Sequence, residues 1–121
     1  MTEQEAMDFV RGSIASVWAL ELLVFLGNER KRSWPFDDIV RELRGSVAAV
    51  EGALQILVSA GLVADVGKRE YRYQPASPAL ETIGEMVQKI YSTKPTTVIA
   101  SIFESPNEKL REFARAFKFK E

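Results

Sequence analysis

Apolar residues between positions 36 and 60 recur at helical spacing in two neighbouring segments. The first set lies at i, i+3, i+4 and i+7 and predicts a helix over about 35–43: Phe36, Ile39, Val40 and Leu43. The second set follows one face of a helix over about 46–60: Val47, Val50, Leu54, Leu57 and Val58. Between them, Gly45 is free to take a positive φ and Ser46 can cap the following helix. The segment therefore predicts two helices joined by a tight turn.

A hairpin follows the second helix. Gly61 stands where a left-handed C-terminal cap is expected. Residues 62–66 and 71–74 then have the composition of two short strands, and 67–70 form a turn that contains Gly67. Helix, turn, helix and two-stranded hairpin, in this order over residues 36–76, predict a winged helix-turn-helix with its wing at about 62–74.

The N-terminal segment predicts one long helix over about 2–26. Thr2 and Glu5 form a capping box, and Gly27-Asn28 is the expected terminator. The second half of this helix is apolar around almost its whole circumference, so both sides need a partner. One partner is the core of the same chain, and the other is either a second subunit or the chain's own C-terminal helices. We favour a two-fold homodimer, with these candidate contacts: Trp18, Leu22, Phe25, Phe113 and Phe117.

Three further helices are expected after the hairpin. Ser77 and Pro78 begin a helix over about 78–92, and Pro95 restarts the chain as a helix over 95–103. A last helix is expected over 106–117, with Phe113 and Phe117 in its apolar stripe. The predicted fold class is mainly α with a small β-hairpin, in a single domain over residues 1–121. Its parts are a long N-terminal helix, the motif at 36–76 and C-terminal helices within 77–121.

Residues 36–76 resemble the winged helix-turn-helix of small bacterial transcription regulators of the MarR, ArsR and PadR kind. The resemblance is clearest from Leu54 to Val63, in the sequence LQILVSAGLV. It implies a regulator that binds double-stranded DNA, with the second helix of the motif in the major groove. Winged helices also dock proteins, so a protein–protein interaction module without direct DNA binding is the alternative.

Composition narrows the chemistry. The 121 residues include no Cys and no His, which removes disulfides, thiolate or imidazole metal sites and the commonest general base. Phosphate-binding loops and metal-ligand spacings are also missing from the sequence, so we expect no enzyme activity, no cofactor and no metal. The longest apolar run, Trp18–Leu26, is too short for a membrane span and is interrupted by Glu21. With no signal-peptide pattern, a cytoplasmic protein without membrane contact is expected.

Net charge is −1, so attraction to DNA has to come from local clusters. The exposed face expected for the helix at 46–60 has no Lys or Arg. On it, Gln55 can pair with adenine, Glu51 can accept from cytosine, and small Ala48 permits close approach. Cations stand at the flanks of this helix instead, in the turn and on the wing. The candidate DNA-binding residues are Arg44, Ser46, Ala48, Glu51, Gln55, Lys68, Arg69 and Arg72.

The loop before the motif leaves an alternative open. Arg30, Lys31 and Arg32 either contact phosphate or form a solvated loop. Trp34 is interpreted as an apolar anchor onto the core. A further hypothesis is that the chain is a small-molecule sensor, but its residues do not identify a ligand.

Overall fold

The computed structural model describes residues 2–103, which are mainly helical with one small antiparallel sheet. In chain order the elements are α1 (Glu3–Phe9), the π-helical η1 (Val10–Ile14), α2 (Val17–Asn28), β1 (Trp34–Pro35), α3 (Phe36–Leu43), α4 (Val47–Ser59), β2 (Val63–Gly67), β3 (Glu70–Tyr73) and α5 (Pro78–Thr93). A further helix covers 95–103. The helix expected over 106–117, with Phe113 and Phe117, lies outside the described residues.

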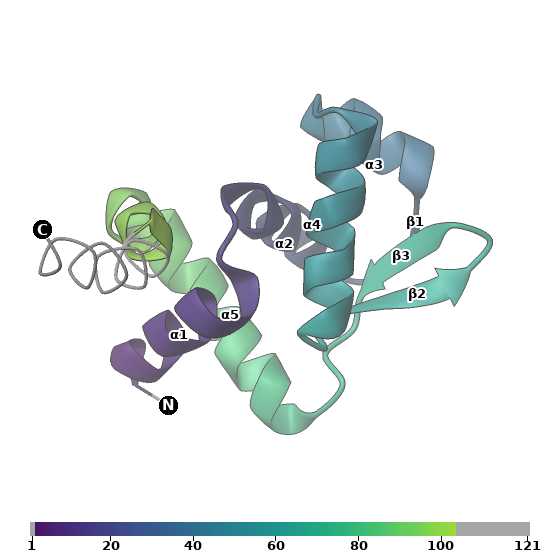
Figure 1. Cartoon of the computed structure of the whole chain (residues 1–121). Coiled ribbons are helices and arrows are strands. Elements are labelled where there is room, and N and C mark those ends of the chain that lie inside the picture. Colours follow the sequence, from purple (N-terminus) through teal and green to yellow (C-terminus); the bar gives the residue numbers. More distant parts are fainter. Residues whose placement is uncertain (1, 104–121) are drawn as a thin grey trace, which may run out of the picture.

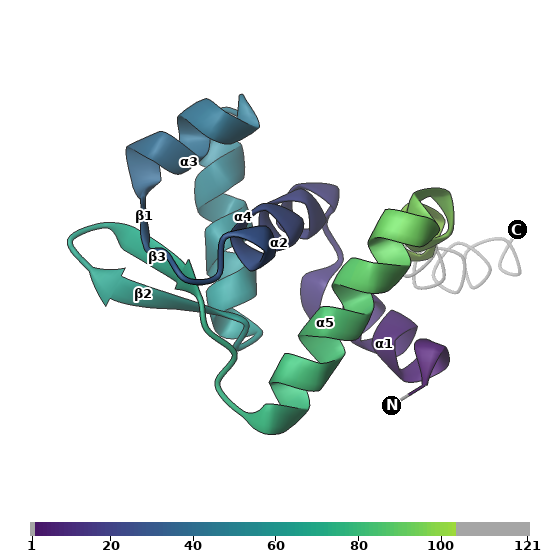
Figure 2. The same ribbon diagram turned by 180° about the vertical axis from the view of Figure 1, so that it is seen from behind.

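Helix α2 lies between two groups of elements. Figure 1 shows α3, α4 and the β2–β3 hairpin at one end and α1, α5 and the helix at 95–103 at the other, and the reverse view in Figure 2 agrees. The leucines of α2 are fully buried between α4 and α5: Leu20, Leu22, Leu23 and Leu26. The apolar circumference expected from the sequence is thus largely covered by the chain itself.

The single helix expected over 2–26 is wrong, because the chain turns sharply in its middle. Ala15 has a left-handed backbone with φ 43°, and the helices before and after it are bent by 114°. Ser16 then caps α2, where its Oγ accepts a hydrogen bond from the amide of Ala19 at 3.2 Å. Thr2 caps α1 as expected and accepts from the amide of Glu5 at 3.1 Å. The bend lets α1 pack on α5 while α2 packs on α4.

Within residues 2–103, no single helix has both the length and the apolar character needed to cross a membrane. Among the described residues, one pair of helices reaches this length and apolar character only when taken together: Glu3–Ile14 and Val17–Asn28, which are bent relative to each other by 114°.

The turn between α3 and α4 uses its residues differently from the sequence expectation. The positive φ falls at Arg44 (54°) rather than at Gly45. Gly45 is needed for close approach, because a Cβ there would lie 2.9 Å from two ring carbons of Trp18. Ser46 caps α4 as expected, with its Oγ accepting from the amide of Ala49 at 3.0 Å. Gly61, with φ 81°, is the left-handed residue expected after α4.

The sheet has three strands in the order β1-β3-β2, one more than expected. Trp34 of β1 pairs with Tyr71 of β3. A strand of two residues is too short to show an alternating pattern, which explains why the sequence did not reveal it. At the hairpin tip, Lys68 and Arg69 both have φ 56°, as a two-residue turn with left-handed backbone requires. An irregularity between Asp65 and Gly67 shifts the register next to this turn.

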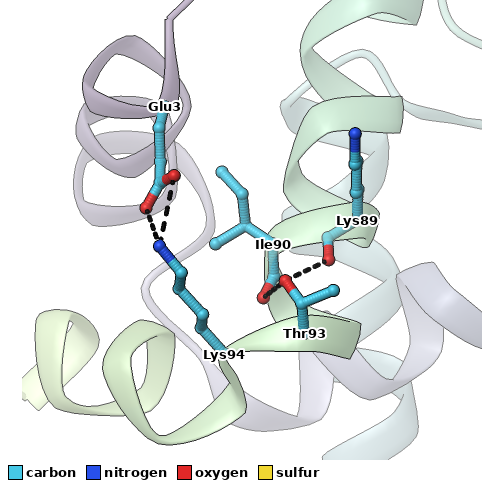
Figure 3. Close-up of polar contacts among 5 residues, drawn as sticks. All are labelled: Glu3, Lys89, Ile90, Thr93 and Lys94. Atoms are coloured by element: carbon cyan, nitrogen blue, oxygen red, sulfur yellow. Dashed lines mark hydrogen bonds and ion pairs between the residues drawn. The ribbon is translucent and has the colours of Figure 1, made fainter.

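The C-terminal helices begin where the sequence places them. Ser77 caps α5 by accepting from the amide of Leu80 at 3.1 Å, with Pro78 as the first helical residue. Figure 3 shows the end of α5, where the ammonium of Lys94 reaches the carboxylate of Glu3 at 3.1 Å and ties α5 to α1. In the helix at 95–103, Val98 and Ile102 are buried, whereas Phe103 is 59% exposed.

Candidate nucleic-acid interface

Helix α4 has one buried face and one face open to solvent. Its buried residues are Val50, Ala53, Leu54 and Leu57. Three candidate residues from the sequence lie on the open face: Ala48, Glu51 and Gln55. The sequence expectation that Val47 and Val58 lie on the buried face is wrong: at the two ends of α4 they are open, Val47 at 56% and Val58 at 38% exposure. The open face is therefore built from small, apolar and uncharged polar groups with one carboxylate, and α4 contains no Lys or Arg.

A groove of about 370 Å³ separates the open face of α4 from the hairpin. Its lining combines α4 residues with one residue from each hairpin strand: Glu51, Leu54, Gln55, Val58, Ser59, Asp65 and Tyr71. The groove thus has two carboxylates and no cation. Asp65 uses one carboxylate oxygen to accept the amide of Gly67 at 2.9 Å, which holds it beside the hairpin turn. The sequence did not predict that Asp65 and Tyr71 would face Gln55, because their proximity depends on how the sheet packs against α4.

Two cations stand at the ends of this surface. Arg44 lies in the α3–α4 turn and Lys68 at the hairpin tip, and both are exposed. Within residues 2–103, neither side chain makes a hydrogen bond, ion pair or ring contact with another described residue. Figure 1 shows the turn at one end of α4 and the hairpin projecting beside it. Positive charge therefore lies at the flanks of the open face.

Arg69 and Arg72 are held by the protein itself. The guanidinium of Arg69 lies over the ring of Phe36, 4.4 Å from its centroid. Arg72 is half-buried and donates from Nε to the carbonyl oxygen of Arg30 at 3.2 Å. The structure thus does not bring all four expected cations into one surface.

The basic loop after α2, which contains Arg30, Lys31 and Arg32, contacts aromatic rings and carboxylates. Arg30 lies 4.9 Å from the ring centroid of Tyr73, and Arg32 lies 3.7 Å from that of Trp34. Arg30 also pairs with Glu85 at 3.5 Å. These stacked arginines join the loop to the sheet and to α5, so two of its three cations have structural partners. Burial raises the pKa of the Tyr73 hydroxyl, so this ring stays neutral beneath Arg30.

Trp34 lies in the core, as its interpretation as an apolar anchor requires. It is buried, and its ring centroid lies 4.7 Å from that of Phe25. The pairing of arginines with rings was missed from the sequence because most partners are far apart along the chain.

The expected dimer residues have different surroundings. Trp18 is 40% exposed and available to a partner, and Phe25 is half-buried against β1. Leu22 is fully buried inside the chain, which removes it from the set of surface candidates. Phe113 and Phe117 lie outside the described residues.

Comparison of this chain with protein-family models, with curated proteins and with solved structures found no match.

Proposed function

We propose that this chain is a cytoplasmic winged helix-turn-helix protein that binds double-stranded DNA and regulates transcription. Helix α4 is the recognition helix in this proposal, and the β2–β3 hairpin is the wing. The observation that supports it most is the open face of α4, which carries hydrogen-bonding side chains between the exposed cations Arg44 and Lys68. Phosphate contacts at both flanks position a helix, while side chains on its face read bases.

The absence of a cation from α4 supports base reading by this face more than strong non-specific attraction. Gln55 can form two hydrogen bonds with adenine, and Glu51 can accept from the amino group of cytosine. Ala48 and Gly52 leave room for close approach, since a Cβ at Gly52 would meet nothing within 4 Å. Each base contact of this kind discriminates by about 1–3 kcal/mol.

A two-fold dimer remains part of the proposal. Trp18, 40% exposed on α2, is the described residue that supports it. Dimerisation would present two copies of α4 to successive turns of the duplex. Light scattering at tens of micromolar protein tests this part, and a monomer at that concentration contradicts it.

The test of DNA binding is fluorescence anisotropy with a random duplex at about 50 mM and about 200 mM salt. We expect binding that weakens steeply with salt. Replacing the two open cations Arg44 and Lys68 together by Ala should weaken binding to all sequences and lower the salt dependence by about two phosphate contacts per subunit. Gln55→Ala should instead change the preferred base at one position. Glu51→Gln should raise non-specific affinity, because it removes a negative charge that faces the phosphates.

Lys89→Ala is the control for loss of a cation, since Lys89 is an exposed residue near the end of α5, a helix that packs on α1 and α2. If wild type fails to bind duplex at the lower salt, or if neither the Arg44/Lys68 variant nor Glu51→Gln changes binding, the DNA proposal is wrong.

A protein-docking module is the second candidate, and the groove beside α4 favours it. Its carboxylates, Glu51 and Asp65, suit a cationic partner better than a phosphate backbone. The exposed valines Val47 and Val58 would add apolar contact. Absence of duplex binding at low salt, together with saturable binding of a Lys- and Arg-rich peptide that Glu51→Gln weakens, would favour this candidate.

A further inference from the structure

A second cavity lies away from the α4 groove, between the first turns of α2 and the end of α3. Its volume is about 450 Å³, and it is lined by Val17, Trp18, Glu21 and Leu43. Three of these side chains are apolar and the fourth is a carboxylate. A lining of apolar side chains with one charged group is typical of small-molecule sites.

Trp18 supplies a large aromatic surface that is held in place. Its indole is 40% exposed, while the edge of the ring packs so closely on the α3–α4 turn that only glycine fits at position 45. One part of the ring is thus fixed by the protein and another part is open. An exposed indole face attracts cations through the negative charge of its π-electrons.

Glu21 supplies a carboxylate whose position is set by a hydrogen bond. The hydroxyl of Tyr91, on α5, donates to Glu21 Oε1 at 2.8 Å. Tyr91 is 8% exposed, and burial together with the Glu21 carboxylate raises the pKa of Tyr91 to about 12, so it remains a donor. Among the described residues, no Lys or Arg pairs with Glu21. The carboxylate is therefore oriented, and no cation of the described residues neutralises it at contact distance.

We propose that this cavity binds a small organic cation with an apolar body, such as a substituted ammonium ion. The cationic group would lie against the Glu21 carboxylate and the Trp18 ring, and the apolar body against Val17 and Leu43. A neutral ligand of the same shape gains the apolar contact alone, and an anion is repelled by Glu21. This proposal does not depend on DNA binding, because it concerns a different surface and a different ligand. It requires that the Trp18 ring stays uncovered, so it and a dimer formed through Trp18 exclude each other.

The probe for the test is benzyltrimethylammonium, compared with benzyl alcohol and benzoate as the neutral and anionic aromatic controls. Binding to the full chain is measured by calorimetry and by tryptophan fluorescence. In the Trp18→Phe variant only the buried Trp34 fluoresces, so the variant shows which part of the signal comes from Trp18. We expect saturable binding of the cation, about tenfold tighter than that of benzyl alcohol, which is the factor expected from a cation–π contact with an exposed ion pair. Benzoate should bind more weakly than either.

The decisive variant is Glu21→Gln, which keeps an oxygen for the Tyr91 hydrogen bond and removes the charge. It should bring the affinity for the cation to within about twofold of that for benzyl alcohol, while circular dichroism shows an unchanged fold. Glu51→Gln, at an exposed carboxylate in the other groove, should leave this binding unchanged. Equal affinity of wild type for the cation and the alcohol would overturn the proposal. Cation binding that disappears as the protein self-associates would overturn it as well, because the cavity would then be a contact between copies.

Discussion

Two regions of the described structure treat their cations in opposite ways. Around the sheet and the loop after α2, the tethered arginines stack on rings or donate to a carbonyl: Arg30, Arg32, Arg69 and Arg72. The open cations, Arg44 in the α3–α4 turn and Lys68 at the hairpin tip, make no such contact with described residues. The sequence places both groups on the surface. The difference shows that counting basic residues overestimates the charge available to a phosphate backbone.

The physical reason lies in the chemistry of the side chains and in their neighbours. A guanidinium is planar and weakly hydrated, so it stacks on an aromatic face while keeping part of its edge in water. Trp34, Phe36 and Tyr73 offer such faces around the sheet. Arg44 and Lys68 are exposed at turns, and no described aromatic ring contacts either side chain. The tethered arginines should therefore affect stability, and the open cations should affect binding.

The largest effect is expected from removing both open cations. Arg44→Ala with Lys68→Ala should lower affinity for random duplex by tens of fold at about 100 mM salt, because each lost phosphate contact is worth roughly eightfold there. The free energy of unfolding should change by less than about 0.5 kcal/mol, since neither side chain packs on the core. Anisotropy and urea denaturation measure the two quantities. A double variant that binds duplex like wild type would remove the distinction between the two groups of cations.

A tethered arginine should behave in the opposite way. Arg32→Ala uncovers the Trp34 ring and removes a stacked guanidinium, so we expect a loss of about 1 kcal/mol in the free energy of unfolding. Duplex affinity should stay unchanged. Lys31→Ala is the matched control, because the neighbouring Lys31 is exposed and no described contact involves its side chain. If the two variants are equally stable, stacking on Trp34 contributes nothing to the fold.

The hydrogen bond from Tyr91 to Glu21 also fixes a side chain, and its contribution to stability should depend on pH. Tyr91→Phe loses the hydrogen bond to Glu21 and should reduce the free energy of unfolding by about 1 kcal/mol at pH 7. The pKa of Tyr91 is raised in the folded state to about 12, so its contribution is fully present below pH 10 and is lost as pH rises toward 12. Wild type should thus lose more stability than Tyr91→Phe between pH 10 and 12, as measured by urea denaturation. Parallel pH profiles would show that this bond is absent in solution.

The smallest effect is expected on the open face of α4. Gly52→Ala adds a Cβ that meets no atom within 4 Å and should stabilise the helix by about 0.5–1 kcal/mol. Gly84→Ala is the control in a packed environment, where the added Cβ would lie 2.7 Å from the hydroxyl of Tyr73 and should destabilise the protein. Thermal unfolding measures both. A loss of stability in Gly52→Ala would mean that this face of α4 is covered in solution.

The sequence by itself determined where most described helices start and stop. Ser46, Ser77 and Gly61 act within three or four residues along the chain, so their signals can be read without knowing the fold. The same is true of the hairpin, whose turn residues and flanking strands are adjacent. The candidate residues Ala48, Glu51 and Gln55 were placed on the open face of α4 because helical periodicity alone sets which side they share.

Tertiary structure decided the features that need contacts between distant segments. The bend at Ala15 follows from α1 packing on α5 while α2 packs on α4, and β1 exists only because β3 is there to pair with it. The same holds for the burial of Leu22 and for the stacking of Arg30 on Tyr73. Both depend on chain segments more than 30 residues away. Local spacing specifies hydrogen bonds within a turn of helix, whereas the surroundings of a side chain depend on which distant surface packs against it.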